Sequence, residues 1–519
     1  MLRFIKFCSL GLLFLVALVL INALTHNPEN EKFLNKITFE INEERAITNL
    51  SNSIKFETIS NQNRSEESLQ EFENFIDWLK QSYQLVHKNT SLQRFNDTLL
   101  FKWEGSNPKL KPILVTGHYD VVPVIPGTED SWAEPPYSGA VDSNYIWGRG
   151  TLDDKSGVIG ILEAVTFLME SGFEPSRSIY LSFGHDEEIG GVNGAAEVAR
   201  HLSESNVQLE WSLDEGSFLL GGFIPGVDKL VAAINVAEKG SVTLQVVGKA
   251  IGGHSSMPTR SSAVGHLSKA LVKLDENRMP GGLDGLSLAM FDEMSKHMPF
   301  VYKIAFANRW LFGGIIDSYL SQVPATNAML RTTTAPTMLS ASVKSNVLPI
   351  EAIALVNFRI HPQNSVEDVF DHVRGLVESD NVEVRALSYR GRPASQVSSW
   401  DSRGYKVIES SVKEIFGDVI VVPGLMIAGS DTRHYGKVAD NSYRFNPFPL
   451  SNEEFAGFHG TNERIKKKDF LDGIKWCFKE IKDKDNKLGL EARINVEKNF
   501  SNEFVSKKYV KLYEDFLTK

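Results

Sequence analysis

Residues 111–120 read Lys-Pro-Ile-Leu-Val-Thr-Gly-His-Tyr-Asp, a short apolar run that ends in a histidine and an aspartate. Apolar runs of this length, bounded by turn residues, are typical of buried strands. Two similar runs, at 177–184 and 209–213, are followed by Asp186-Glu187-Glu188 and by Asp214. Each predicted strand therefore leads directly into residues that could bind a ligand.

Helical spacing separates these predicted strands, at 155–172 and at 194–202. Alternating strands and helices indicate an α/β fold with a mostly parallel sheet that is flanked by helices. In such sheets, ligands bind beyond the carboxyl ends of the strands. The acidic clusters and His118 all fall at that edge.

The pattern changes near residue 238. Residues 241–248 and 352–360 alternate apolar and polar side chains, as strands with one solvated face do. Helical stretches near 263–276 and 366–378 accompany them, which predicts a smaller α+β domain inserted into the first. We expect the chain to divide into a leader at 1–26, a first domain at 27–237 that resumes at 391–519, and the inserted domain at 238–390.

Length and charge narrow the class of protein. A chain of 519 residues favours more than one domain, and 42% hydrophobic with 23% charged residues is ordinary for a soluble globular protein. The net charge of −10 disfavours nucleic acid as a partner.

The N-terminus carries Arg3 and Lys6 and then an uncharged apolar run from Phe7 to about Leu24. Such a run is a signal peptide or a membrane anchor. Ala23 and Thr25 make a mediocre cleavage site, which favours an uncleaved signal anchor with the rest of the chain outside the cytoplasm. We expect a vacuolar, lysosomal or extracellular location, either anchored or secreted.

His118 and Asp120 could act together, with the imidazole binding a metal and the carboxylate fixing its tautomer. Asp153, which precedes a predicted helix, is either an N-cap or a carboxylate that bridges two cations. In Glu187-Glu188, one carboxylate could bind metal while the other serves as general base.

Two further positions complete the set. Asp214 ends its strand as a candidate terminal ligand, with Glu215 as a close competitor. His459, in a glycine-flanked loop, could bind a second metal. Imidazole mixed with carboxylate suits zinc or a similar divalent ion, so the residues together predict a two-metal hydrolase site.

Four motifs resemble those of the zinc-dependent aminoacylase and carboxypeptidase metallopeptidase family. They occur in the family's order, and the chain is most similar to the branch of carboxypeptidase S and the secreted N-fatty-acyl-amino-acid synthase/hydrolase. The motifs are Gly117-His118-Tyr119-Asp120-Val121-Val122-Pro123, Trp147-Gly148-Arg149-Gly150 with the stretch to Lys155, Asp186-Glu187-Glu188-Ile189-Gly190-Gly191, and Gly252-Gly253-His254-Ser255-Ser256-Met257-Pro258.

The resemblance implies a role for each residue. His118 and Asp214 would bind one of two zinc ions per subunit, Glu188 and His459 the other, with Asp153 between them. Asp120 would orient His118, and Glu187 would be the general base. The inserted domain would be a lid and dimerisation domain. Its His254 would stabilise the oxyanion, often across a homodimer, while Asn346 and Arg359 would hold the substrate carboxylate; a structural salt bridge is the alternative for Arg359.

The predicted function is hydrolysis of the amide bond next to a free C-terminal carboxylate, in a peptide or an N-acyl amino acid, with synthesis as the reverse reaction. The competing interpretation is a catalytically inactive binding or receptor ectodomain on the same scaffold. The complete ligand set, together with Glu187, disfavours it. A serine hydrolase is disfavoured because the chain has no Gly-x-Ser-x-Gly motif.

Overall fold

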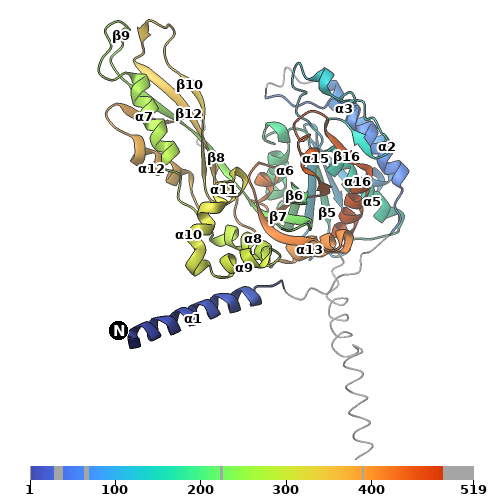
Figure 1. Ribbon diagram of the computed structural model, residues 1–519. Coiled ribbons are helices and arrows are strands. Elements are labelled where there is room, and N and C mark those ends of the chain that lie inside the picture. Colours follow the sequence, from blue (N-terminus) through green and yellow to red (C-terminus); the bar gives the residue numbers. More distant parts are fainter. Residues whose placement is uncertain (1, 29–38, 63–68, 223–225, 388–390, 483–519) are drawn as a thin grey trace, which may run out of the picture.

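The computed structural model describes residues 2–28, 39–62, 69–222, 226–387 and 391–482 (Figure 1). The end of the predicted resumed domain, residues 483–519, lies outside the described residues. The described chain forms two main sheets, each with its own helices, that lie side by side in Figure 1.

The larger sheet has eight strands and is mostly parallel, as the sequence predicts. In its centre β5, β3, β6 and β15 run parallel to one another, and β14 runs parallel to β7. The spatial order is β1 (Ser91–Phe95), β2 (Thr98–Trp103), β5 (Ile179–Gly184), β3 (Ile113–His118), β6 (Leu209–Leu220), β15 (Ala439–Leu450), β7 (Val231–Glu238) and β14 (Ile420–Met426).

Helices cover both faces of this sheet, because alternate side chains of its strands are apolar on both sides. In β3, Ile113 and Val115 belong to one core cluster, whereas Leu114 belongs to another on the opposite face. The first face packs against α2 (Glu43–Ile54), α3 (Leu69–Ser82), α4 (Gln84–Asn89), α5 (Lys155–Glu170), α13 (Arg403–Phe416) and α16 (Lys467–Ile481). The second packs against α6 (Ala195–Glu204) and the short α14 (Thr432–Tyr435).

The smaller sheet is antiparallel and has four strands. Their order is β10 (Thr333–Ser340), β12 (Glu351–Ile360), β8 (Gly240–Lys249) and β13 (Val382–Ala386). The two helices α7 (Ala263–Glu276) and α12 (Val366–Val377) pack on one face of it, where every second residue of β12 is buried. At the far end of this part of the molecule, β9 (Gly253–His254) pairs with β11 (Val347–Leu348) (Figure 1).

Four helices join the two parts: α8 (Gly285–Ser295), α9 (Phe300–Ala307), α10 (Arg309–Leu320) and α11 (Pro324–Leu330). Sequence patterns did not predict them. Met290 and Met294 of α8 share a core cluster with Ile420 and Val422 of β14, so this segment packs against the edge of the larger sheet.

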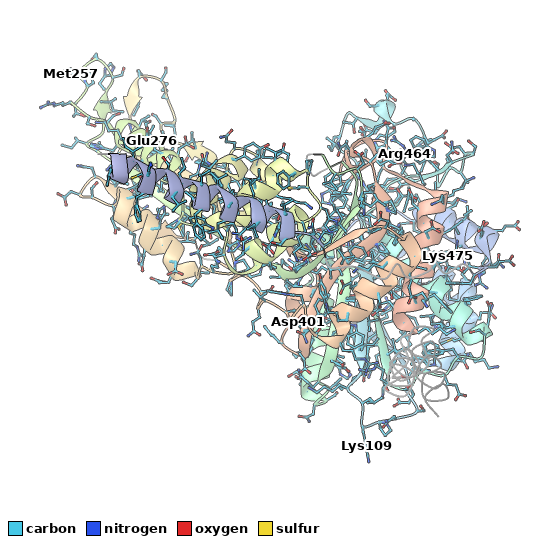
Figure 2. The ribbon with its side chains drawn as sticks, turned by 60° about the horizontal axis from the view of Figure 1, so that its bottom comes forward. Lys109, Met257, Glu276, Asp401, Arg464 and Lys475 are labelled. Atoms are coloured by element: carbon cyan, nitrogen blue, oxygen red, sulfur yellow. The ribbon has the colours of Figure 1, made fainter. Side chains whose placement is uncertain are left out.

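The N-terminal helix α1 (Leu2–Thr25) contains a stretch, Phe4–Thr25, that is long and apolar enough to cross a membrane by length and composition. Its C-terminal end contacts α9, and Asn22 Nδ2 donates a hydrogen bond at 2.9 Å to Oδ1 of Asn308, the residue that follows α9. In both Figure 1 and Figure 2, α1 lies beside the helices that join the two parts.

Candidate active site

The predicted ligands meet at the carboxyl edge of the larger sheet. His118 is the last residue of β3 and lies opposite Gly184, the last residue of the parallel strand β5. The chain then enters a single 3₁₀ turn, Glu187–Ile189, which brings both glutamates to the same edge. Asp153 arrives from the loop before α5, and His459 from the loop between the short helix α15 (Asn452–Phe455) and β16 (Arg464–Lys466).

Asp153 lies between the two histidines. Its Oδ1 is 3.0 Å from Nε2 of His118, and its Oδ2 is 2.6 Å from Nε2 of His459. Glu188 Oε2 is 3.5 Å from the same His459 nitrogen. One carboxylate therefore faces an imidazole on each side, which is the arrangement that a bridging ligand between two cations requires.

Asp120 is fully buried and positions its neighbours. Its Oδ1 is 3.2 Å from Nδ1 of His118, and the same carboxylate accepts hydrogen bonds from the backbone N–H groups of Glu187 and Glu188 at 3.2 and 3.1 Å. Ser60 Oγ, which sequence reasoning did not single out, also donates to it at 2.6 Å. Asp120 thus fixes both an imidazole and the glutamate turn.

Glu187 and Glu188 occupy different environments. Glu187 forms an ion pair with the partly buried guanidinium of Arg433, whereas Glu188 faces Asp153 and His459. Burial, together with the nearby Glu188 and Asp120 carboxylates, raises the pKa of Glu187 to about 8. A carboxylate with a pKa near neutrality can both accept and return a proton, as a general acid–base group must.

Arg433 was missed at the level of sequence. It belongs to Ser430-Asp431-Thr432-Arg433, which follows strand β14 as the acidic clusters follow their own strands. Position at the end of a strand was therefore the available signal, but a lone arginine in a loop did not stand out.

The structure differs from the expectation for Asp214. Its Oδ2 accepts hydrogen bonds from the backbone N–H and Oγ1 of Thr432 at 2.8 and 2.7 Å, and its Oδ1 accepts from the N–H of Glu215 at 2.9 Å. Glu215, the competitor, places Oε1 at 3.5 Å from Nε2 of His118. Successive side chains of a strand point to opposite sides, so only one of the two can face the histidine.

The loop that carries Asp153 is held by a buried ion pair. Arg149 Nη1 donates to Glu463 Oε2 at 2.6 Å, and both side chains are almost fully buried. Glu463 Oε1 also accepts from the backbone N–H groups of Gly150, Leu152 and Asp153. Sequence reasoning did not single out Glu463, because a glutamate in a polar loop has no distinguishing local pattern.

The donor set fits divalent cations. Oxygen or nitrogen atoms of His118, Glu187 and Glu215 lie within 4.8 Å of one another, and so do those of His118, Asp153 and Glu188. Oε1 of Glu188 is buried without a hydrogen-bond partner among the described residues. Burial and the charge of Asp153 raise the pKa of Glu188 to about 7. Such crowded carboxylates are stabilised by positive charge between them.

The residues predicted in the inserted domain lie apart from this cluster. His254 is exposed at the β9–β11 pair, where its Nδ1 is 2.8 Å from Ser256 Oγ. Figure 2 places Met257, three residues further on, at the far tip of the molecule. Asn346 adjoins His254, since its carbonyl accepts from Ser255 N–H. Arg359 is exposed on β12 and forms no ion pair within the described ranges, so the salt-bridge alternative finds no partner there.

Comparison with known proteins gives the family. The model of peptidase family M20/M25/M40 matches residues 114–482, which include the whole metal-ligand cluster. The chain belongs to the M20 peptidase family. The family resemblance inferred from the motifs is thereby confirmed, and with it the assignment as a metallopeptidase or amidohydrolase enzyme.

Two relatives are similar to this chain over most of its length. The chain is 41% identical over 421 residues to "Probable carboxypeptidase S-like 2" of Dictyostelium discoideum, covering 80% of each chain. It is 39% identical over 389 residues to "N-fatty-acyl-amino acid synthase/hydrolase PM20D1" of Mus musculus, covering 74% of this chain and 76% of that one.

Solved structures confirm the M20 fold. The M20 family metallo-carboxypeptidase Sso-CP2 from Sulfolobus solfataricus matches with a TM-score of 0.60 at 18% identity, covering 84% of this chain and 98% of that chain. Human carnosine dipeptidase 1 matches with a TM-score of 0.58 at 16% identity, covering 85% and 95%. The α/β fold with a mostly parallel sheet and an added lid domain, predicted from sequence, is confirmed.

Proposed function

We propose that this M20 enzyme is a di-zinc metallohydrolase that cleaves the amide bond next to a free carboxylate. The observation that carries the proposal is the position of Asp153, with one oxygen against His118 and the other against His459. A buried carboxylate shared by two imidazoles, with further carboxylates beside each of them, is suited to holding two cations rather than one.

His118 and Glu215 would hold one zinc ion, Glu188 and His459 the other, and Asp153 would contact both. Glu215 replaces Asp214 in this assignment because it is the carboxylate beside His118, while Asp214 is bonded to Thr432. When bound, zinc supplies positive charge that polarises a carbonyl and lowers the pKa of water from about 15.7 to about 7.

Glu187 would then act as the general base. It takes a proton from the water that attacks the amide carbonyl, and it returns that proton to the nitrogen of the leaving amine. Burial raises its pKa above the ordinary carboxyl value, which favours the return of the proton to the leaving amine. An ion pair with Arg433 and a hydrogen bond from its own backbone N–H to the Asp120 carboxylate hold Glu187 in place.

His254, Asn346 and Arg359 would bind the substrate from the lid. Because His254 lies at the exposed tip, we propose that a homodimer formed through the lid domain brings this residue to the catalytic edge of the second subunit. There it would donate a hydrogen bond to the developing oxyanion, while Asn346 and Arg359 would hold the carboxylate.

The two relatives support one of two substrate classes for this enzyme, a peptide or an N-acyl amino acid. The same site can also run in the direction of synthesis when amine and acid are abundant. The apolar N-terminal helix supports entry into the secretory pathway, and we propose that it anchors the enzyme to a membrane with its sites outside the cytoplasm.

The test is a direct assay of the purified full-length protein with its metal content measured. A panel of dipeptides and N-acyl amino acids is incubated with protein that carries about two zinc ions per chain. Hydrolysis of either class, lost on chelation and restored by zinc, supports the proposal. Zinc-loaded protein that hydrolyses neither class contradicts it and favours the binding ectodomain.

A further inference from the structure

A cavity of about 330 Å³ lies between the larger sheet and the four joining helices. Phe218 of β6, Val231 of β7 and Val422 of β14 line the sheet side, and α8 to α11 line the other. Ligand pockets commonly begin at about 300 Å³, so the space exceeds an ordinary packing defect.

The lining is apolar and adaptable. It includes Met290, Met294, Met298 and Met329, whose unbranched thioether side chains can adjust to different shapes. No charged side chain of the described residues contributes to it. A polar or charged group placed against this lining would lose its hydrogen bonds to water without replacing them, so the cavity favours an apolar ligand.

The cavity begins beside the candidate metal centre. Ser217 and Phe218 follow Glu215 on the same strand, and a strand rises about 3.3 Å per residue, which places them within about 10 Å of it along β6. The Phe218 ring contacts the Phe458 ring edge-on at 5.9 Å between centroids, and Phe458 stacks on His459 at 4.7 Å. One aromatic ring thus separates the cavity wall from a predicted zinc ligand.

The cavity is also open to the surface at α10. Ile315 and Tyr319 of α10 belong to its lining and are 66% and 55% exposed. Trp310 and Leu311 of the same helix are also exposed. The end of an alkyl chain longer than the cavity could therefore extend out over α10 without passing charged side chains of the lining.

We propose that this cavity binds the hydrocarbon chain of a long-chain N-acyl amino acid, with the amide at the metal centre and the chain extending among α8 to α11. The occupant is an unbranched alkyl or alkenyl chain, because the lining offers apolar contact along its length and no charged group. The assignment rests on the amide hydrolysis proposed above and selects between its two substrate classes.

Chain length is the first readout. Each buried methylene contributes about 0.8 kcal/mol, or roughly a fourfold rise in kcat/KM. For full-length zinc enzyme in lipid nanodiscs, which keep detergent chains out of the cavity, kcat/KM should rise from N-acetyl through N-hexanoyl to N-dodecanoyl phenylalanine. A flat series overturns the proposal.

Ala305→Trp is the matched perturbation, because Ala305 lines the cavity on α9 and an indole there fills it. This variant should keep N-acetyl-phenylalanine hydrolysis and lose the rise with chain length. Ala307→Trp, on the same helix but outside the lining, should keep both. If Ala305→Trp fails to fold, Ala325→Phe at an exposed lining position replaces it. An unchanged slope in a folded lining variant overturns the proposal.

Binding separates this inference from the proposed reaction. N-palmitoyl-phenylalanine should displace a fluorescent polyene fatty acid from the wild type, and at least tenfold more weakly from the lining variant. Wild-type protein that binds in this way but hydrolyses nothing supports the cavity while contradicting the hydrolase. Hydrolysis of short-chain substrates without such displacement contradicts the cavity alone.

Discussion

The identity of the carboxylate beside His118 can be tested with two neighbouring substitutions, Glu215→Gln and Asp214→Asn. Glu215 Oε1 lies 3.5 Å from His118 Nε2, whereas the oxygens of Asp214 are bonded to Thr432 and to the backbone of Glu215. We therefore expect Glu215→Gln to remove a ligand of one zinc ion and Asp214→Asn to leave both zinc sites in place.

The two effects should differ in kind as well as in size. Changing an outer partner of a ligand typically costs ten- to a hundredfold in metal affinity, so loss of the ligand itself should cost more than about a hundredfold. Asp214→Asn replaces one carboxylate oxygen by an amide NH₂ group, which donates instead of accepting. The variant therefore loses at least one of the hydrogen bonds that the charged Asp214 carboxylate accepts from Thr432 and from the backbone of Glu215. Its cost should appear as about 1–3 kcal/mol of unfolding free energy.

Metal content after dialysis, zinc titration against a competing chelator and urea unfolding measure these quantities. Glu215→Gln should retain about one zinc ion per chain, and Asp214→Asn about two with a lower unfolding midpoint. The reverse result, one zinc in Asp214→Asn and two in Glu215→Gln, would refute the assignment. Glu174→Gln, at an exposed position before β5 and remote from the site, is the control for the effects of purification and dialysis.

Three further predictions follow from buried charges. Glu187→Gln should retain zinc and fold but lose about 10²- to 10⁴-fold in kcat, because it removes the general base; substantial residual turnover would disprove that role. Glu463→Gln should lower the unfolding free energy by about 3–5 kcal/mol, because it leaves the Arg149 guanidinium buried without a charged partner. Adding Arg149→Met to this variant should recover part of the lost unfolding free energy. Urea unfolding measures both changes. Burial and the charge of Arg359 lower the pKa of Lys239 to about 7, from about 10.4 in an unfolded chain. Between those pH values the unfolded chain binds more protons at this lysine than the folded chain does, so the unfolding free energy should rise with pH by at most about 1.4 kcal/mol per pH unit. Lys239→Met should remove that contribution. Equal pH slopes of the unfolding free energy in the wild type and the variant, measured by urea unfolding, would contradict the effect.

Local periodicity was enough to predict the framework of the fold. The strands that end at His118 and Gly184 and the helices α5, α7 and α12 lie where apolar spacing places them, within one or two residues. These elements bury one or both faces completely, so burial dictates their patterns. The helices α8 to α11 were not predicted, because they pack against β14 across the chain rather than against a neighbouring element.

The sequence by itself determined the family and the class of chemistry, since residue type and order along the chain are sufficient for these, and it predicted the candidate ligands. Only the tertiary structure decided which of Asp214 and Glu215 faces His118, because adjacent side chains of a strand point to opposite sides and the packing of the sheet selects one. It also brought Arg433 to Glu187 and Glu463 to the loop of Asp153. Those pairs join residues hundreds of positions apart, and no local pattern marks such contacts.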